Sequence, residues 1–109
     1  MSLRTTPECF HVFGSGATAT IVLIPAVPGK RVLIQRMVVT LGSGNTNVTL
    51  QDTSGAAMSQ PFQGAANELI IFNMQANGEP WWTTSPGLGF QIGQSGTVTI
   101  GYDVWYTLW

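Results

Sequence analysis

The sequence predicts an all-β protein, a single-domain antiparallel β-sandwich or jelly-roll-like barrel of about eight strands. Val, Ile and Thr are frequent and occur in short apolar runs, as is typical of strands. Gly, Ser, Asn and Pro interrupt these runs every roughly 8–14 residues, the spacing of sandwiches and barrels. The chain has 109 residues, which is enough to close one hydrophobic core but not two. No segment has the pattern of a helix.

The strands follow from the positions of the turn residues. Gly14-Ser15-Gly16 ends the first strand, and the two prolines and the glycine of 25–30 fix a turn before the third. Asn77-Gly78 is the strongest short turn signal, since both residues accept positive φ. The expected strands are 8–13, 18–24, 31–41, 46–51, 68–73, 81–84, 88–92 and 97–108.

Two strands allow a test of alternation. In strand 46–51, Val48 and Leu50 share one face while Asn47, Thr49 and Gln51 share the other, which predicts a half-exposed strand. In strand 31–41, strict alternation puts residues 32, 34, 36, 38 and 40 on one face. Residues 31, 33, 35, 37, 39 and 41 then lie on the other face. Neither face is purely polar, so we expect this strand to be covered on both sides, with a second layer from a partner subunit.

The organisation along the chain is simple. We expect residues 1–17 to form an N-terminal arm and first strand, and residues 18–109 to form the β-sandwich domain. Apolar residues make up 44% of the chain and charged residues only 8%, with a formal net charge of −1. A soluble domain usually carries roughly 25% charged residues. A neutral, partly apolar surface therefore indicates burial against other protein surfaces.

The composition argues against several other classes. Four basic residues cannot form the stripe that phosphate neutralisation requires, so no nucleic-acid partner is expected. The longest apolar runs, 21–24 and 69–72, are too short to span a membrane. The single cysteine, Cys9, excludes an intrachain disulfide. The N-terminus shows no secretory signal, so we expect synthesis in a cytoplasm.

Candidate catalytic groups are few, and we predict no enzyme activity. Cys9 and His11 fall on the same strand face and make the one nucleophile–base hypothesis, although a structural pair is the more economical interpretation. One Cys and one His cannot make a zinc site without two carboxylates, so no metal or cofactor is expected. Asp52 is interpreted as a turn former and not a calcium ligand. Asp103 is expected to pair with Arg31 or Arg36 on a neighbouring strand.

The aromatic residues are the main candidates for interaction. On the last strand, Tyr102, Val104, Tyr106 and Leu108 face one way, and Asp103, Trp105, Thr107 and Trp109 face the other. We expect at least two of the four tryptophans to fill the core, and Trp109 to be an intersubunit anchor. The predicted interface residues are Trp81, Trp82, Trp105, Tyr106, Trp109 and Arg36.

From residue 18 to the end, the sequence resembles the small β-sandwich head decoration or cement proteins of bacteriophages. The resemblance rests on Gly29-Lys30-Arg31 between two apolar strands, on the Gly64-Ala65-Ala66-Asn67 stretch, on Pro80-Trp81-Trp82-Thr83-Thr84 with the following Gly-rich turn, and on the closing strand 96–102.

The resemblance implies a non-enzymatic virion protein that binds the major capsid protein and stabilises the capsid surface, as a homotrimer at a symmetry axis. A carbohydrate-binding module, or a tail-associated receptor-binding domain, is the alternative. It is motivated by the tryptophans, whose rings stack on sugars.

Overall fold

The computed structural model describes residues 9–109, and every regular element in this range is a strand. The strands are β1 (Cys9–Gly16), β2 (Thr20–Ile24), β3 (Val32–Leu41), β4 (Thr46–Asp52), β5 (Phe62–Gly64), β6 (Leu69–Phe72), β7 (Trp82–Thr83), β8 (Phe90–Gln94) and β9 (Ile100–Leu108). The short β5 lies in a segment for which no strand was predicted from the sequence pattern.

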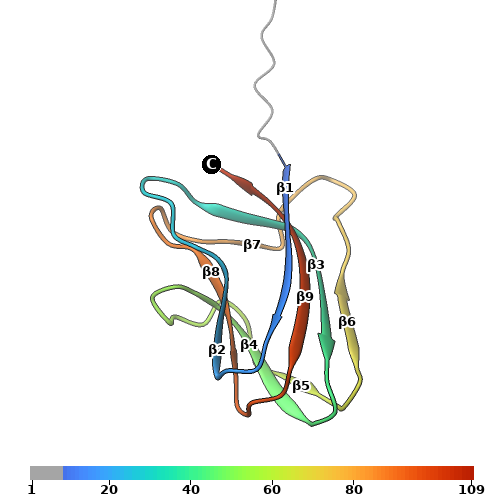
Figure 1. The fold of residues 1–109 in the computed structure, drawn as a ribbon. Coiled ribbons are helices and arrows are strands. Elements are labelled where there is room, and N and C mark those ends of the chain that lie inside the picture. Colours follow the sequence, from blue (N-terminus) through green and yellow to red (C-terminus); the bar gives the residue numbers. More distant parts are fainter. Residues whose placement is uncertain (1–8) are drawn as a thin grey trace, which may run out of the picture.

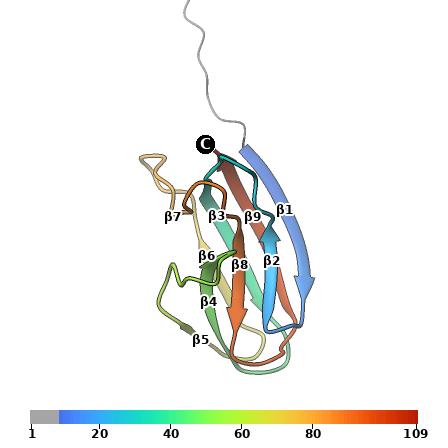
Figure 2. The ribbon, with the colours of Figure 1, turned by 90° about the vertical axis from the view of Figure 1, so that its left-hand side faces the viewer.

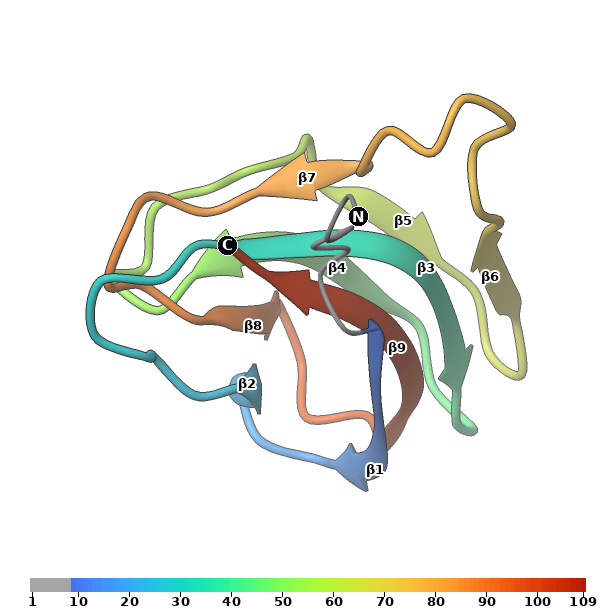
Figure 3. The ribbon, with the colours of Figure 1, turned by 90° about the horizontal axis from the view of Figure 1, so that it is seen from above.

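The strands form two antiparallel sheets packed face to face. One has the order β1-β9-β3-β6, with β7 also paired to β3, and the other has the order β2-β8-β4-β5. Figure 1 shows the strands in one view, and Figure 2 looks onto β2, β8 and β4 with β9 and β3 behind them. The two layers are also visible from above in Figure 3.

The pairing is nested. β1 pairs with β9, β2 with β8, β3 with β6, and β4 with β5, so the chain folds back on itself as a doubled hairpin. This arrangement of two four-stranded sheets is a jelly roll, here with the short β7 added. The predicted all-β sandwich is confirmed.

The core lies between the sheets and consists of aliphatic side chains with one phenylalanine and one methionine. No tryptophan belongs to it among the described residues, so the expectation that two or more tryptophans fill the core is wrong. Trp82 packs against the core but is only partly buried, and Trp81 and Trp109 are exposed. The core residues are Ile21, Leu23, Ile24, Val32, Ile34, Met37, Val39, Leu41, Val48, Leu50, Phe90, Ile92, Ile100 and Val104.

A β-bulge in β3 changes the faces predicted for this strand. Ile34 is paired with Tyr106 and Arg36 with Trp105, so Gln35 is an extra residue with no partner of its own on β9. The bulge brings Val32 and Ile34 onto the same inner face as Met37, Val39 and Leu41, all of them buried. The prediction from strict alternation is therefore wrong, and β3 has one core face and one outer face.

The alternation predicted for the other two strands is confirmed. In β4, Val48 and Leu50 are buried while Asn47 is exposed. In β9, Val104 is buried in the core, Tyr102, Tyr106 and Leu108 pack against it, and Trp105 points to the opposite face.

The predicted Asn77-Gly78 turn has the backbone conformation that favours glycine. Gly78 has a positive φ, of 75°.

The sandwich extends to the first described residue. β1 pairs with β9 along its whole length, from Cys9 opposite Thr107 to Gly16 opposite Ile100. The boundary expected at residues 17 and 18 thus falls in the short connection between β1 and β2, and β1 is an edge strand of the sheet. Residues 1–8 of the predicted arm lie outside the described residues.

Candidate functional site

The candidate site is the solvent-facing side of the sheet β1-β9-β3-β6, which we call the outer face. Residues paired across antiparallel strands present their side chains on the same face. The register therefore places three residues in one transverse row at its centre, His11 on β1, Trp105 on β9 and Arg36 on β3. A neighbouring row holds Phe13, Asp103, Val38 and Ile71.

The central row is a stack of planar groups. The His11 and Trp105 rings lie 4.3 Å apart between centroids, with 13° between their planes. The Arg36 guanidinium carbon lies 4.4 Å from the Trp105 ring centroid, which is a cation–π contact. Because β9 runs between β1 and β3, the two groups approach Trp105 from opposite sides. Phe13 extends the stack, with its ring centroid 5.6 Å from that of His11.

The carboxylate on this face belongs to Asp103, and its partner differs from the prediction. Oδ1 of Asp103 lies 2.9 Å from Nε2 of His11, and no ion pair to Arg31 or Arg36 forms among the described residues. His11 and Arg36 are both diagonal neighbours of Asp103, but the Arg36 guanidinium stacks on Trp105, which leaves His11 as the partner of Asp103. Arg36 instead donates from Nε to Oδ1 of Asn73, at 3.4 Å.

Large apolar side chains are exposed around this polar centre. Phe13 is 73% exposed, Leu69 is 54% exposed and Ile71 is 46% exposed. Leu69 is opposite Thr40, and Ile71 is opposite Val38, so both lie on the outer face. The outer face of a lone sandwich is normally polar, whereas here large apolar side chains are exposed at both edges of the sheet, on β1 and on β6.

Trp81 and Trp82 belong to a separate aromatic cluster beside β6. Phe72 is in edge contact with both, at centroid distances of 5.5 Å for Trp81 and 4.9 Å for Trp82. Trp82 packs against the core, whereas Trp81 is 39% exposed and donates its indole N–H to the carbonyl of Asn73 at 2.6 Å. Of the two, only Trp81 is accessible enough to bind a partner directly.

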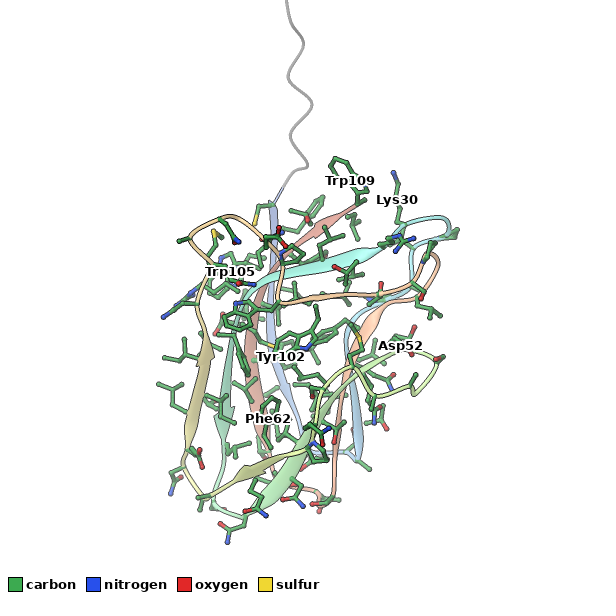
Figure 4. All side chains as sticks on the ribbon, turned by 180° about the vertical axis from the view of Figure 1, so that it is seen from behind. Lys30, Asp52, Phe62, Tyr102, Trp105 and Trp109 are labelled. Carbon is green, nitrogen blue, oxygen red and sulfur yellow. The ribbon has the colours of Figure 1, made fainter. Side chains whose placement is uncertain are left out.

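Trp109 is 62% exposed and borders an apolar hollow of about 490 Å³. Its backbone is tied to Arg31 by two hydrogen bonds of 3.0 Å, which hold the backbone of Trp109 in place just after β9. Figure 4 shows Trp105 and Trp109 toward the end of the molecule where the chain terminates. The hollow is lined by Cys9, Leu33, Gln35, Met74, Gly78, Pro80, Thr107 and Trp109.

Tyr106 is, like Trp82, a predicted interface residue on the inner side of its sheet. It packs against the core, and its ring is stacked on that of Phe10 at 5.5 Å. Its position therefore gives no support to an interface role, in contrast to Trp105, the next residue along β9.

The remaining chemical hypotheses find little geometric support. His11 Nε2 is engaged by Asp103, and the Cys9 thiol donates weakly to the Phe10 carbonyl, so no Cys9–His11 hydrogen bond forms. Within residues 9–109, no group of three or more Cys, His, Asp or Glu side chains converges as a metal site.

Asp52 is a turn residue, as its sequence context indicates. Its Oδ1 accepts hydrogen bonds from the backbone N–H groups of Ser54, at 2.9 Å, and Ala56, at 3.2 Å, and from the Ser54 hydroxyl. The hydroxyl contact is the main cause of a lowered pKa of the Asp52 carboxyl. The residue lies on the far side of the molecule from Trp105 (Figure 4).

The opposite sheet has an outer face of a different character. The register of β2, β8 and β4 aligns Thr20, Gly93 and Thr49 in one row, and Val22, Gln91 and Gln51 in the next. Gln91 donates to the side-chain oxygen of Gln51 at 2.7 Å. This face is uncharged and mostly polar, so the apolar and aromatic residues are concentrated on the outer face of the β1 sheet.

Sequence reasoning did not include Phe13, His11, Leu69 and Ile71 among the interface residues. The unbroken run Leu69-Ile70-Ile71-Phe72 was a usable signal, because an edge strand that is apolar on both faces must expose one of them. For Phe13 and His11 there was no such signal, since their neighbours on β9 are distant in the sequence.

Comparison with models of known protein families finds no match, and no curated protein is significantly similar to the chain. Among the described residues there is no helix of the length and apolarity needed to cross a membrane.

Proposed function

We propose that this protein is a non-enzymatic structural protein of a bacteriophage virion, which binds the major capsid protein and stabilises the capsid as a homotrimeric decoration protein. The observation that carries the proposal is the outer face of the β1 sheet. Phe13, Leu69 and Ile71 expose apolar surface around the Arg36–Trp105 stack in a chain with only 8% charged residues. Such a surface becomes stable when another protein covers it.

The architecture is compatible with this role. Jelly rolls occur in viral capsid proteins, but also in lectins and other classes, so the fold alone does not select a function. The resemblance of residues 18–109 to phage decoration proteins favours the capsid. The virion surface is the corresponding location, after synthesis in the host cytoplasm.

The test has two measurements. Light scattering should give the mass of three chains of 11.7 kDa each, and the protein should cosediment with purified phage shells that lack it. Shells treated in this way should resist heating better than bare shells, because a ligand that binds only the assembled state stabilises it. A strict monomer that also fails to bind shells would contradict the proposal.

A carbohydrate-binding or tail-associated receptor-binding module is the second candidate, and the exposure of Trp81 favours it. Glycan-array binding that disappears in Trp81→Ala, with unchanged thermal stability, would support this function. Trp82→Ala is a poorer test, because Trp82 packs against the core and its loss affects folding.

A further inference from the structure

Arg36 is held in a defined orientation on the outer face. The ring of Trp105 lies under its guanidinium at 4.4 Å, and Asn73 Oδ1 accepts from its Nε at 3.4 Å. Trp105 lies on β9 and Asn73 directly follows β6, so the two neighbours restrict the Arg36 side chain from two directions. Because the Arg36 side chain is already restrained, it loses little conformational entropy when it binds a partner. Arginines are enriched among the residues that contribute most to binding energy at interfaces.

Within residues 9–109, the Arg36 guanidinium makes no ion pair with a carboxylate. Asp103, the carboxylate on the same face, is paired with His11. Glu68 accepts from the backbone N–H of Ala65 at 2.7 Å, and Asp52 caps its own turn. Among residues 9–109, no side chain accepts a hydrogen bond from the two terminal amino groups of Arg36. These groups form the fork that matches a carboxylate.

The apolar hollow beside Trp109 is adjacent to Arg36. Leu33 and Thr107 are paired, and they form the next outer row along β3 and β9, after the row of Arg36 and Trp105. In an extended chain, side chains on the same face are two positions apart in sequence and about 7 Å apart in space. An extended segment above this sheet can thus place an acidic side chain on Arg36 and an apolar side chain in the hollow.

We propose that Arg36 and the hollow together recognise an extended segment of a partner protein with an Asp or Glu two positions from a large apolar residue. The carboxylate accepts two hydrogen bonds from the Arg36 fork, and the apolar side chain packs against Leu33, Met74 and Trp109. The inference rests on the proposed function, because it gives the chemistry of the partner surface that the outer face contacts.

The surroundings favour a protein carboxylate over other anions. A nucleic acid requires several cations, and within residues 9–109 the only basic side chain in the row of Arg36 or in the two adjacent rows is His11, which is paired with Asp103. An acidic sugar presents hydroxyl groups, whereas Asn73 is the one side chain that hydrogen-bonds Arg36 among residues 9–109, and Val38, Ile71 and the mostly apolar hollow lie in the adjacent rows.

The test uses two capped peptides, acetyl-Leu-Ser-Glu-Ser-Leu-amide and the same peptide with Gln in place of Glu. Each is titrated into the full-length protein up to about 10 mM, the range of weak contacts. The indole N–H resonance of Trp105 reports binding. The Glu peptide should bind at least tenfold more tightly than the Gln peptide, and Arg36→Gln should remove this difference. Arg31→Gln is the matched control, since it removes the same charge from a residue outside the stack, and it should keep the difference.

Equal binding of the two peptides, or no binding of either, would overturn the proposal, as would tighter binding of glucuronate than of the Glu peptide. A shell-binding assay separates this inference from the proposed function. Arg36→Gln should bind shells at least tenfold more weakly than Arg31→Gln. If both variants bind shells equally well, the role of Arg36 is disproved while the proposed function stands. If wild type binds the peptide but not shells, only the proposed function fails.

Discussion

Nε2 of His11 lies 2.9 Å from Oδ1 of Asp103, and this contact joins the edge strand β1 to the long strand β9 on the exposed side of the sheet. A carboxylate only accepts hydrogen bonds, so Nε2 carries the proton. The pair supports one end of the stack in which Trp105 lies between His11 and Arg36.

The first prediction concerns the energy of this pair. The side chains of His11 and Asp103 are 39% and 47% exposed, and exposed pairs contribute about 1 kcal/mol or less. A double-mutant cycle with His11→Ala and Asp103→Ala, followed by urea denaturation, should give a coupling free energy below that value. A coupling of several kcal/mol would show that the pair is essential to the fold.

The second prediction concerns the bulge in β3. Deletion of Gln35 leaves Val32, Ile34, Met37, Val39 and Leu41 in regular alternation, so the core face is preserved. The deletion variant should fold, with a loss of about 1 kcal/mol, the typical cost of a single change. Chemical denaturation measures this loss.

Deletion of Val38 is the control, because the same length change has the opposite consequence for the core. It turns Val39 and Leu41 to the outer face, and each lost burial costs about 1.5–3 kcal/mol. This variant should be unfolded or far less stable. Equal stability of the two deletion variants would contradict the assigned register.

The third prediction concerns the pH dependence of the Asp52 turn. The Ser54 hydroxyl and the turn N–H groups lower the pKa of the Asp52 carboxyl below its ordinary value of 3.8. The stabilisation by the carboxylate is therefore present above pH 3.8, and it is lost as the pH falls through the lowered value. Carbon NMR of the carboxyl group in Ser54→Ala should show a higher pKa than in wild type. An unchanged pKa would mean that the hydroxyl contact is absent in solution.

The fourth prediction concerns the core. Ile92 is fully buried on the central strand β8, so Ile92→Ala should lower the free energy of unfolding by about 2–5 kcal/mol. Val22→Ala on the neighbouring strand should cost less than about 1 kcal/mol, because Val22 is half exposed. Urea denaturation of both variants measures the difference, and comparable losses would contradict the burial of β8.

The fifth prediction separates folding from assembly on the outer face. Phe13→Ser and Ile71→Ser change exposed side chains, so each should alter the stability of the single chain by less than about 0.5 kcal/mol. The double variant should nevertheless lose binding to purified shells, as measured by cosedimentation. Retained shell binding would show that the capsid is contacted through another surface of the protein.

Much of the fold could be predicted from the sequence, because strands and turns are indicated by local sequence patterns. The alternation of Val48 and Leu50 with Asn47 and Thr49 depends only on the two-residue period of a strand, and the Asn77-Gly78 turn depends only on backbone preferences. The sandwich class was predicted from such features. The bulge at Gln35 was missed because one inserted residue leaves no mark in the sequence and becomes visible only against the partner strand β9.

The candidate site could be predicted only in part from the sequence. The sequence by itself determined that the surface is poor in charge and rich in aromatic residues, since composition does not depend on folding. Only the tertiary structure decided that Trp105 lies between Arg36 and His11, that Asp103 pairs with His11, and that Tyr106 turns inward. Strands distant in the sequence become neighbours through the nested pairing of the jelly roll, and the register of that pairing selects which side chains meet.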